Sequence, residues 1–143
     1  MLIILTRSNH WISRAIRLVI WDEHSHGGIV IGDNVYEASG PKGGVVVTPL
    51  SEFKKQYTNW EYWQLPTKGN YQEKAKALVN SKYDHGALIK HLTRLNKSRP
   101  DEWYCFEYIA YCSGVFNIDL CDRVTSVHLK MVGTKIKSYD ERA

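Results

Sequence analysis

Disulfide chemistry and long apolar segments are what this chain of 143 residues lacks most clearly. Its cysteines are Cys105, Cys112 and Cys121, an odd number confined to one third of the sequence, which does not resemble the disulfide framework of a secreted domain. The apolar start, residues 1–5, is too short for the core of a signal peptide. No stretch approaches the roughly 20 apolar residues that cross a bilayer. These absences predict a cytoplasmic protein with reduced thiols and no transmembrane segment.

An excess of charge of one sign is missing as well. The 19 basic and 15 acidic residues leave a net charge of +4 without any long basic block, a pattern that does not indicate a nucleic-acid partner. The 43% hydrophobic and 24% charged residues are ordinary for a globular protein. Because repeats, low-complexity segments and linkers are also missing, the sequence predicts a single domain over residues 1–143.

Apolar periodicity and turn residues predict a mixture of strands and helices, which is an α+β architecture. Strands are expected at residues 2–5, 28–31, 34–38, 45–47 and 60–65. Helices are expected at residues 11–20, 51–57 and 71–82, after Tyr83–Asp84, and from Cys105 onward. Residues 124–132 fit either a helix or a strand.

Two residues far apart in the sequence offer the chemistry of a cysteine nucleophile. Cys105 falls in the first turn of an expected helix, and His26 opens an apolar strand. The thiolate is the reactive form of cysteine, and both a helix N-terminus and a neighbouring imidazolium favour it. Glu107, on the same helix, fits an orienting role or solvent exposure, whereas Cys112 and Cys121 fit the core. The pattern predicts Cys105 as nucleophile and His26 as its base.

The expected hairpin adds a third residue to this pair. If Gly32–Asp33 form a two-residue type II′ turn, Glu37 faces position 28, and His26 lies two residues beyond on the same face of the hairpin. His26 and Glu37 are then diagonal neighbours, roughly 7–8 Å apart at Cα. A turn shifted by one residue would move Glu37 farther away, and a three-residue loop would place the two side chains on opposite faces. The proximity of His26 and Glu37 therefore depends on this register.

In that register the three side chains divide the work of acyl transfer. Cys105 attacks an acyl carbon, His26 takes the thiol proton, and Glu37 fixes the imidazole tautomer and stabilises its charged form. The oxyanion needs backbone N–H groups at the start of the Cys105 helix, with Tyr83 as the expected side-chain donor. Tyr104, directly before the nucleophile, is a second candidate for contact with the oxyanion or the substrate.

The same segments carry a family resemblance. Residues 25–32, Ser-His-Gly-Gly-Ile-Val-Ile-Gly, with Val-Tyr-Glu-Ala at 35–38, resemble the histidine hairpin of the circularly permuted NlpC/P60 (papain-like) superfamily. Trp-Tyr-Cys-Phe-Glu-Tyr-Ile at 103–109 resembles its nucleophile helix, and Tyr83–Asp84 a pair that often precedes that helix. The YiiX/YebB-like subgroup of bacteria and their phages is the most similar, over roughly residues 8 to 113. Phe106 departs from the small polar residue usual after the cysteine.

The resemblance implies a fold, an activity and a residue order. The fold is papain-like, with the nucleophile helix packed on a small antiparallel sheet, and His26 and Glu37 precede Cys105 as in the permuted branch. The implied activity is a cysteine peptidase or amidase without cofactor, acting on a peptide or other amide substrate such as cell-wall peptide. The residues themselves then predict a hydrolase with a thioacyl-enzyme intermediate.

Three alternatives accompany this prediction. A lipid-directed thiol acyltransferase or phospholipase would carry an apolar groove or a membrane-attaching segment. A binding module on the same fold would have a buried Cys105, or a His26 out of its reach. His24 and His26 are spaced like two zinc ligands, with Asp22, Glu37 or Cys105 as a third, but no paired metal motif supports such a site and His24 is expected at the surface or the rim of the site. No metal is therefore predicted.

Overall fold

The computed structural model of the chain describes residues 1–7, 14, 18, 22–57, 59–86 and 102–140. Its strands are β1 (Leu2–Arg7), β2 (His26–Ile31), β3 (Asn34–Ser39), β4 (Gly44–Pro49), β5 (Asn59–Gln64), β6 (Lys82–Tyr83), β7 (Glu102–Trp103) and β8 (Thr134–Asp140). Its helices are α2 (Leu50–Lys55), α3 (Tyr71–Ala77), α5 (Cys105–Ser113) and α6 (Ser126–Val132), with a 3-10 helix η1 (Ile118–Arg123). The helix predicted at 11–20, apart from Arg14 and Leu18, and the one predicted after Asp84 lie outside the described residues.

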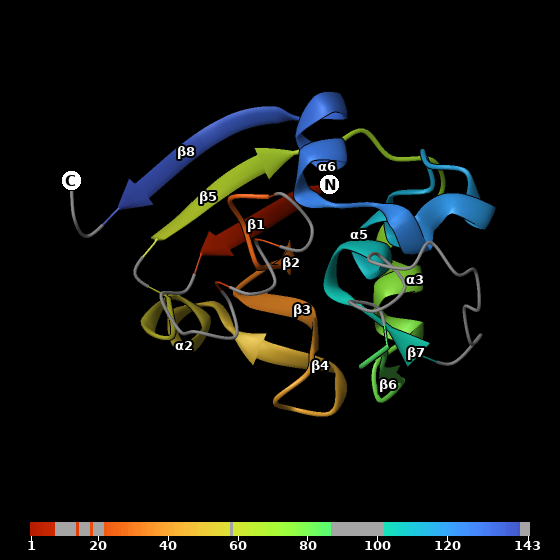
Figure 1. Ribbon diagram of the computed structural model, residues 1–143, viewed down its shortest axis with the longest axis horizontal. Helices are drawn as coiled ribbons and strands as arrows, with labels where there is room; N and C mark the ends of the chain where they lie inside the picture. The colour runs from red at the N-terminus through yellow and green to blue at the C-terminus, as the bar shows by residue number, and fades with distance from the viewer. Residues whose placement is uncertain (8–13, 15–17, 19–21, 58, 87–101, 141–143) are drawn as a thin grey trace.

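The described strands form one curved sheet. Their order is β7-β6-β4-β3-β2-β1-β5-β8, and every neighbouring pair is antiparallel except the short parallel pair β6–β7. Strands β1, β5 and β8 run side by side and curve together (Figure 1). The α+β class is confirmed. The sheet is larger than the small antiparallel sheet expected, because residues 134–140 add an unpredicted edge strand and two short strands extend the other edge.

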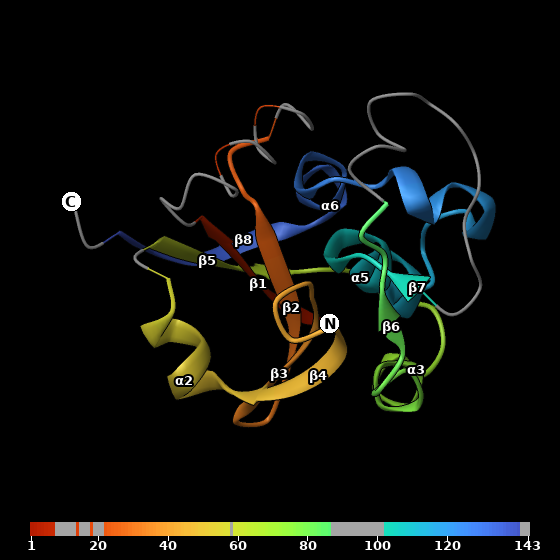
Figure 2. The same ribbon diagram turned by 60° about the horizontal axis from the view of Figure 1, so that its bottom comes forward.

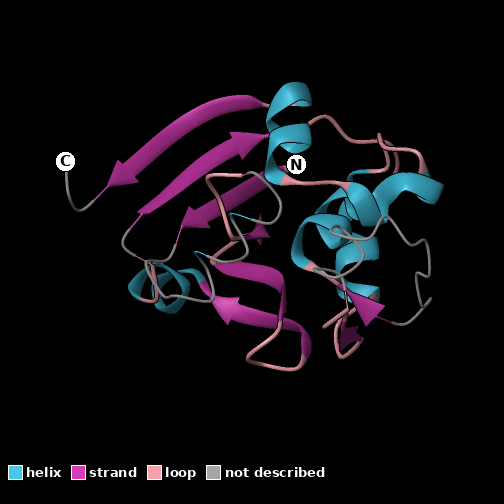
Figure 3. Cartoon of the chain, in the orientation of Figure 1, coloured by secondary structure: helices cyan, strands magenta, loops and turns pink. Residues whose placement is uncertain are grey.

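The sheet buries apolar side chains on both faces. In β1, Ile3 and Leu5 belong to the larger core cluster, whereas Ile4 between them belongs to the smaller one, as the two-residue period of a strand requires. The helices divide in the same way: α3, α5 and α6 lie together on one side of the strands, and α2 lies apart from them (Figures 2 and 3). Phe53 of α2 fills the smaller cluster.

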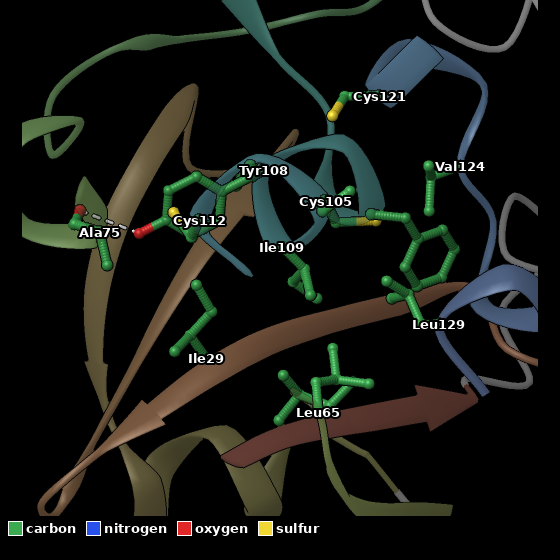
Figure 4. Packing of buried hydrophobic residues seen from close by; sticks show 14 of the residues in the cluster. Ile29, Leu65, Ala75, Cys105, Tyr108, Ile109, Cys112, Cys121, Val124 and Leu129 are labelled. Carbon is green, nitrogen blue, oxygen red and sulfur yellow. Dashed lines mark hydrogen bonds between the residues drawn. The ribbon is translucent and has the colours of Figure 1, made fainter. Parts of the chain in front are cut away.

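Helix α5 is the central element of the larger cluster. All of its residues except Tyr111 are buried, and it packs against β2, β3, α3 and η1. The Tyr108 hydroxyl donates to the carbonyl oxygen of Ala75 in α3 at 2.9 Å (Figure 4). Gly114 ends the helix with a left-handed φ of 69°, the usual conformation of a C-terminal glycine. Cys112 and Cys121 are buried in this cluster, as predicted.

The helix predicted over residues 71–82 is wrong in its second half. Helix α3 ends at Ala77, and Asn80 adopts a left-handed φ of 73°. The backbone beyond it bonds to β4, because Asn80 N–H donates to Val45 at 2.9 Å and Val45 N–H donates to Ser81 at 2.8 Å. A Cβ on Gly44 would lie 2.0 Å from the Ser81 oxygen, so only glycine permits this approach. Pairing with β4 overrides the helical propensity of the segment.

The segment 124–132, left open between helix and strand, is helical from Ser126 onward. Its first turn carries a capping box in which the Thr125 N–H donates to His128 Nδ1 at 3.1 Å. None of the described helices is both long and apolar enough to span a membrane.

Candidate active site

The hairpin of β2 and β3 has the predicted register. Ile31 pairs with Asn34, Val30 with Val35 and Ile29 with Tyr36, which places Gly32–Asp33 in a two-residue turn. Gly32 has a φ of +59°, whereas Asp33 does not have a positive φ, as a type II′ turn requires. The register prediction is confirmed. It follows that His26 and Glu37 lie on the same face of the hairpin.

His26 and Glu37 are directly hydrogen-bonded. His26 Nε2 lies 2.5 Å from Glu37 Oε2, and the side chain of Glu37 is 1% exposed. An ionised carboxylate only accepts hydrogen bonds, so Nε2 carries the proton and donates it to Glu37. This tautomer leaves Nδ1 of the neutral ring as an acceptor. The imidazole therefore presents its basic nitrogen on the side away from Glu37.

Two further side chains hold Glu37, and the sequence reasoning missed both. The Lys42 ammonium donates to Glu37 Oε1 at 2.8 Å, and the Thr48 hydroxyl donates to the same oxygen at 2.6 Å. Lys42 also donates to Thr48 at 2.7 Å. Since Glu37 pairs with Val46, Thr48 lies two residues along β4 on the same face, a position that the β3–β4 register could have predicted. No comparable rule places Lys42, which comes from the Gly40–Gly44 loop.

These partners keep Glu37 ionised. Burial alone would raise its pKa, but the hydrogen bonds from His26, Lys42 and Thr48 and the charge of His26 outweigh burial and lower the pKa of Glu37 to about 2. A carboxylate that stays charged at neutral pH stabilises a positive charge on the imidazole beside it.

Cys105 lies beside the imidazole of His26, as Glu37 does. It is the first residue of α5, after an extended Tyr104 at the N-cap, and its thiol is close enough to His26 to raise the pKa of the imidazole. Because Glu37 occupies Nε2, Nδ1 is the nitrogen left for the thiol. The first intrahelical bond runs from Tyr108 N–H to Tyr104, so the amides of Cys105 and Phe106 precede it in the first turn. Cys105 is 1% exposed.

His26 is held in its charged form. Burial disfavours the imidazolium, but the Tyr57 oxygen and the hydrogen bonds with Cys105 and Glu37 outweigh burial and raise the pKa of His26 well above its ordinary value. Burial in turn raises the pKa of Tyr57, so Tyr57 is a neutral phenol at neutral pH. The Cys105 thiol and the Glu37 carboxylate are therefore the partners that decide the direction in which the pKa of His26 shifts.

Tyr83 and Tyr104 both lie near the thiol but differ in their contacts. Burial and the neighbouring Cys105 raise the pKa of Tyr83 above its usual range, so its hydroxyl keeps its proton. Its ring lies over Gly40, where an added Cβ would approach it to 3.2 Å. The Tyr104 hydroxyl instead donates to the carbonyl oxygen of Val124 at 3.1 Å. The hydroxyl proton of Tyr104 is therefore used in a hydrogen bond to the backbone.

Within the described residues, His24 does not contact the His26–Glu37 pair through any of its polar partners, and the prediction that it is exposed is wrong. It is 3% exposed, with Nε2 at 3.5 Å from Glu61 and Nδ1 at 3.3 Å from the Ser126 hydroxyl, and its backbone N–H donates to Asp22 at 3.1 Å. Burial and the charge of Lys130 lower the pKa of His24. Contacts with Glu61 and Ser126, which are 37 and 102 positions away in the sequence, hold it inside, and the local sequence carries no sign of them.

The zinc alternative gains no support from these positions. His24 and His26 have different partners, Glu61 and Glu37. In the part of the chain that the structure describes, no group of three or more His, Cys, Asp and Glu side chains is placed to hold a metal ion. Glu107, for which solvent exposure or an orienting role stood open, is buried on α5.

A comparison with solved structures finds the same fold. The crystal structure of the metalloprotein yiiX from Escherichia coli O157:H7, a DUF1105 protein, matches with a TM-score of 0.61 and 21% sequence identity. The match covers 78% of this chain and 62% of that protein, so this chain spans under two thirds of its length. No family model matches the sequence, and no curated protein matches it either. The likeness therefore concerns the fold.

Proposed function

We propose that this protein is a cysteine hydrolase that cleaves an amide bond through a thioacyl-enzyme intermediate, with Cys105, His26 and Glu37 as its triad. The observation that carries the proposal is the imidazole of His26, which is hydrogen-bonded to the Glu37 carboxylate and has the Cys105 thiol beside it. An imidazolium beside the sulfur favours the thiolate, which is the nucleophilic form. Glu37, kept ionised by Lys42 and Thr48, supports that charge.

The reaction proceeds in two halves. In the ion pair the Cys105 proton already lies on His26 Nδ1, and the thiolate sulfur forms a bond to the acyl carbon. The tetrahedral intermediate collapses as the carbon–nitrogen bond breaks, and the leaving amine takes the proton from His26. Water then gives a proton to His26 and attacks the thioester, and the carbon–sulfur bond breaks to release the carboxylic acid. The released thiolate and the protonated His26 restore the ion pair, so the enzyme is regenerated.

The negative charge that develops on the acyl oxygen needs donors beside the sulfur. The amides of Cys105 and Phe106 lie in the first turn of α5, where the helix dipole also favours negative charge. Tyr83, whose hydroxyl stays protonated, is the proposed side-chain donor. Tyr104 has a supporting role, because its hydroxyl bond to Val124 anchors the residue that precedes the nucleophile.

The permuted papain-like resemblance of the sequence supports a peptide or cell-wall peptide as the substrate class. The yiiX protein is described as a metalloprotein, but the residues described here do not fit a metal. Beside His24, which lies near Asp22, Glu23 and Glu61, the Lys130 ammonium pairs with Glu23 and lies 3.4 Å from His24 Nδ1, where it would repel a second cation. The proposed mechanism uses side chains and backbone amides of the protein, together with water.

A binding module without turnover is the second candidate, because Cys105 is 1% exposed. Alkylation separates the two candidates, since it needs no knowledge of the substrate. Iodoacetamide should label Cys105 at about pH 6 at least tenfold faster in the wild type than in His26→Ala, because an unperturbed thiol is ionised only near pH 8.5.

Cys112 provides the internal control. Burial raises the pKa of the Cys112 thiol to about 12, so it should react slowly at neutral pH in both proteins. Tandem mass spectrometry of the digested protein, with fragmentation between the cysteines, reports the three thiols separately. Equally slow labelling of Cys105, Cys112 and Cys121 in the wild type would refute the hydrolase and favour the binding module.

A further inference from the structure

The end of α2 brings two aromatic side chains against His26 that the proposed mechanism does not use. Phe53 lies within the helix and is fully buried. Tyr57 follows the helix end, where its N–H donates to the Lys54 carbonyl at 3.4 Å. The two residues are four positions apart, and their rings contact each other.

Both rings stack on the imidazole. The His26 and Phe53 ring centroids are 5.9 Å apart with their planes at 28°, and those of His26 and Tyr57 are 5.8 Å apart at 25°. The Phe53 and Tyr57 centroids are only 5.0 Å apart, so the two rings lie on one side of the imidazole and do not sandwich it. A rotation of the imidazole toward this side would push it against these rings.

The stack also suits the charge on His26. A cation within about 6 Å of an aromatic centroid is attracted to the face of the ring. The titratable groups that face His26 are Cys105 from α5, Glu37 from β3 and Tyr57 after α2. Burial disfavours the imidazolium, and an aromatic face offsets part of that loss without adding a hydrogen bond.

We propose that Tyr57 is a positioning residue for His26, and that its ring, together with Phe53, holds the imidazole in the orientation that joins Cys105 to Glu37. The proposal rests on the cysteine chemistry above and assigns the role to the ring of Tyr57, not to its hydroxyl. Phe53 is part of the core, so Tyr57 is the residue whose replacement tests the idea.

The test is the pH dependence of iodoacetamide labelling of Cys105 in three proteins. Tyr57→Phe keeps the ring and should label within about twofold of the wild type. Tyr57→Leu removes the aromatic face and should label about fivefold to tenfold more slowly, with the half-maximal pH raised by about half to one unit. Tyr57→Met serves as a second variant without a ring if the leucine variant does not fold.

Tyr62→Leu is the matched control, because Tyr62 belongs to the same core cluster but its ring packs on Trp60 at 5.1 Å. It should label like the wild type. Wild-type rates in both ring-less variants would overturn the proposal, and so would a Tyr57→Phe variant as slow as Tyr57→Leu, which would assign the role to the hydroxyl. A wild type that labels slowly would instead refute the hydrolase itself.

Discussion

The variant Glu37→Gln should hydrolyse p-nitrophenyl acetate, a generic acyl probe, about 10²- to 10⁴-fold more slowly than the wild type. The reason lies in the donors that surround Glu37. His26, Lys42 and Thr48 all donate to its two oxygens, so the site contains only donors. A glutamine amide has one acceptor oxygen and one NH₂ group, and neither orientation satisfies all three partners.

Each orientation of the glutamine costs something different. With NH₂ toward His26, the ring must carry its proton on Nδ1 and can no longer accept the thiol proton of Cys105. With the oxygen toward His26, NH₂ faces the Lys42 ammonium and the Thr48 hydroxyl. In both cases the negative charge that stabilises the imidazolium is gone, so the charged pair of His26 and Cys105 weakens.

Glu37→Gln should also lower the free energy of unfolding, by an amount that depends on pH. The pKa of Glu37 is lowered to about 2 from an ordinary value of 4.5, so its contribution to stability is present above about pH 4.5 and is lost as pH falls toward 2. That shift corresponds to about 3 kcal/mol. The pKa of His26 is raised, so its contribution is complete below about pH 6.5 and is lost as pH rises through its folded value.

Urea unfolding of wild type and Glu37→Gln at a series of pH values measures this contribution. The difference in free energy of unfolding should shrink between about pH 4.5 and pH 2. Glu52→Gln is the matched control, since Glu52 is an exposed carboxylate paired with Lys55 three residues away. A Glu37→Gln variant as active as Glu52→Gln would remove Glu37 from the triad.

The second large effect is expected for His26→Ala, which should lose about 10³-fold or more in hydrolysis of the same ester. Without the imidazole, Cys105 has no base, and water has none in the second half of the reaction. Added imidazole should restore part of the activity, because the cavity left beside Cys105 accepts a free ring. A purely structural role of His26 would not give this rescue.

The matched control is His128→Ala, which removes an exposed histidine that caps α6. It should keep its activity and lose only about 1 kcal/mol of stability. Unchanged ester hydrolysis in His26→Ala, or no rescue by imidazole in a folded variant, would contradict the role of His26 as the base.

The parts of the site that the sequence predicted are those that local chemistry determines. Gly32–Asp33 selects the turn, the turn selects the register, and the register brings Glu37 to His26. Cys105 begins its helix as the apolar pattern indicates. These predictions depend only on residues that are adjacent in the sequence or paired across one hairpin. Contacts with the rest of the chain therefore do not change them.

The parts that were missed depend on the conformation of a loop or on contacts between distant segments. Lys42 reaches Glu37 from a loop, and Tyr57 reaches His26 from the end of a helix on the far side of the sheet from α5. His24 was expected at the surface and is buried by Glu61 and Ser126. The end of α3 was misplaced because pairing with β4 overrides helical propensity.

The central claim is a covalent acyl group on Cys105, and rapid-quench mass spectrometry after mixing with p-nitrophenyl acetate tests it most directly. The expected result is an acetyl group on the peptide that carries Cys105, and hydroxylamine should remove it as it removes a thioester. The Cys105→Ala variant should show neither this acetyl group nor hydrolysis of the ester. Cys105→Ala that hydrolyses the ester at the wild-type rate, or a wild type that turns over without an acetyl group on Cys105, would contradict the account.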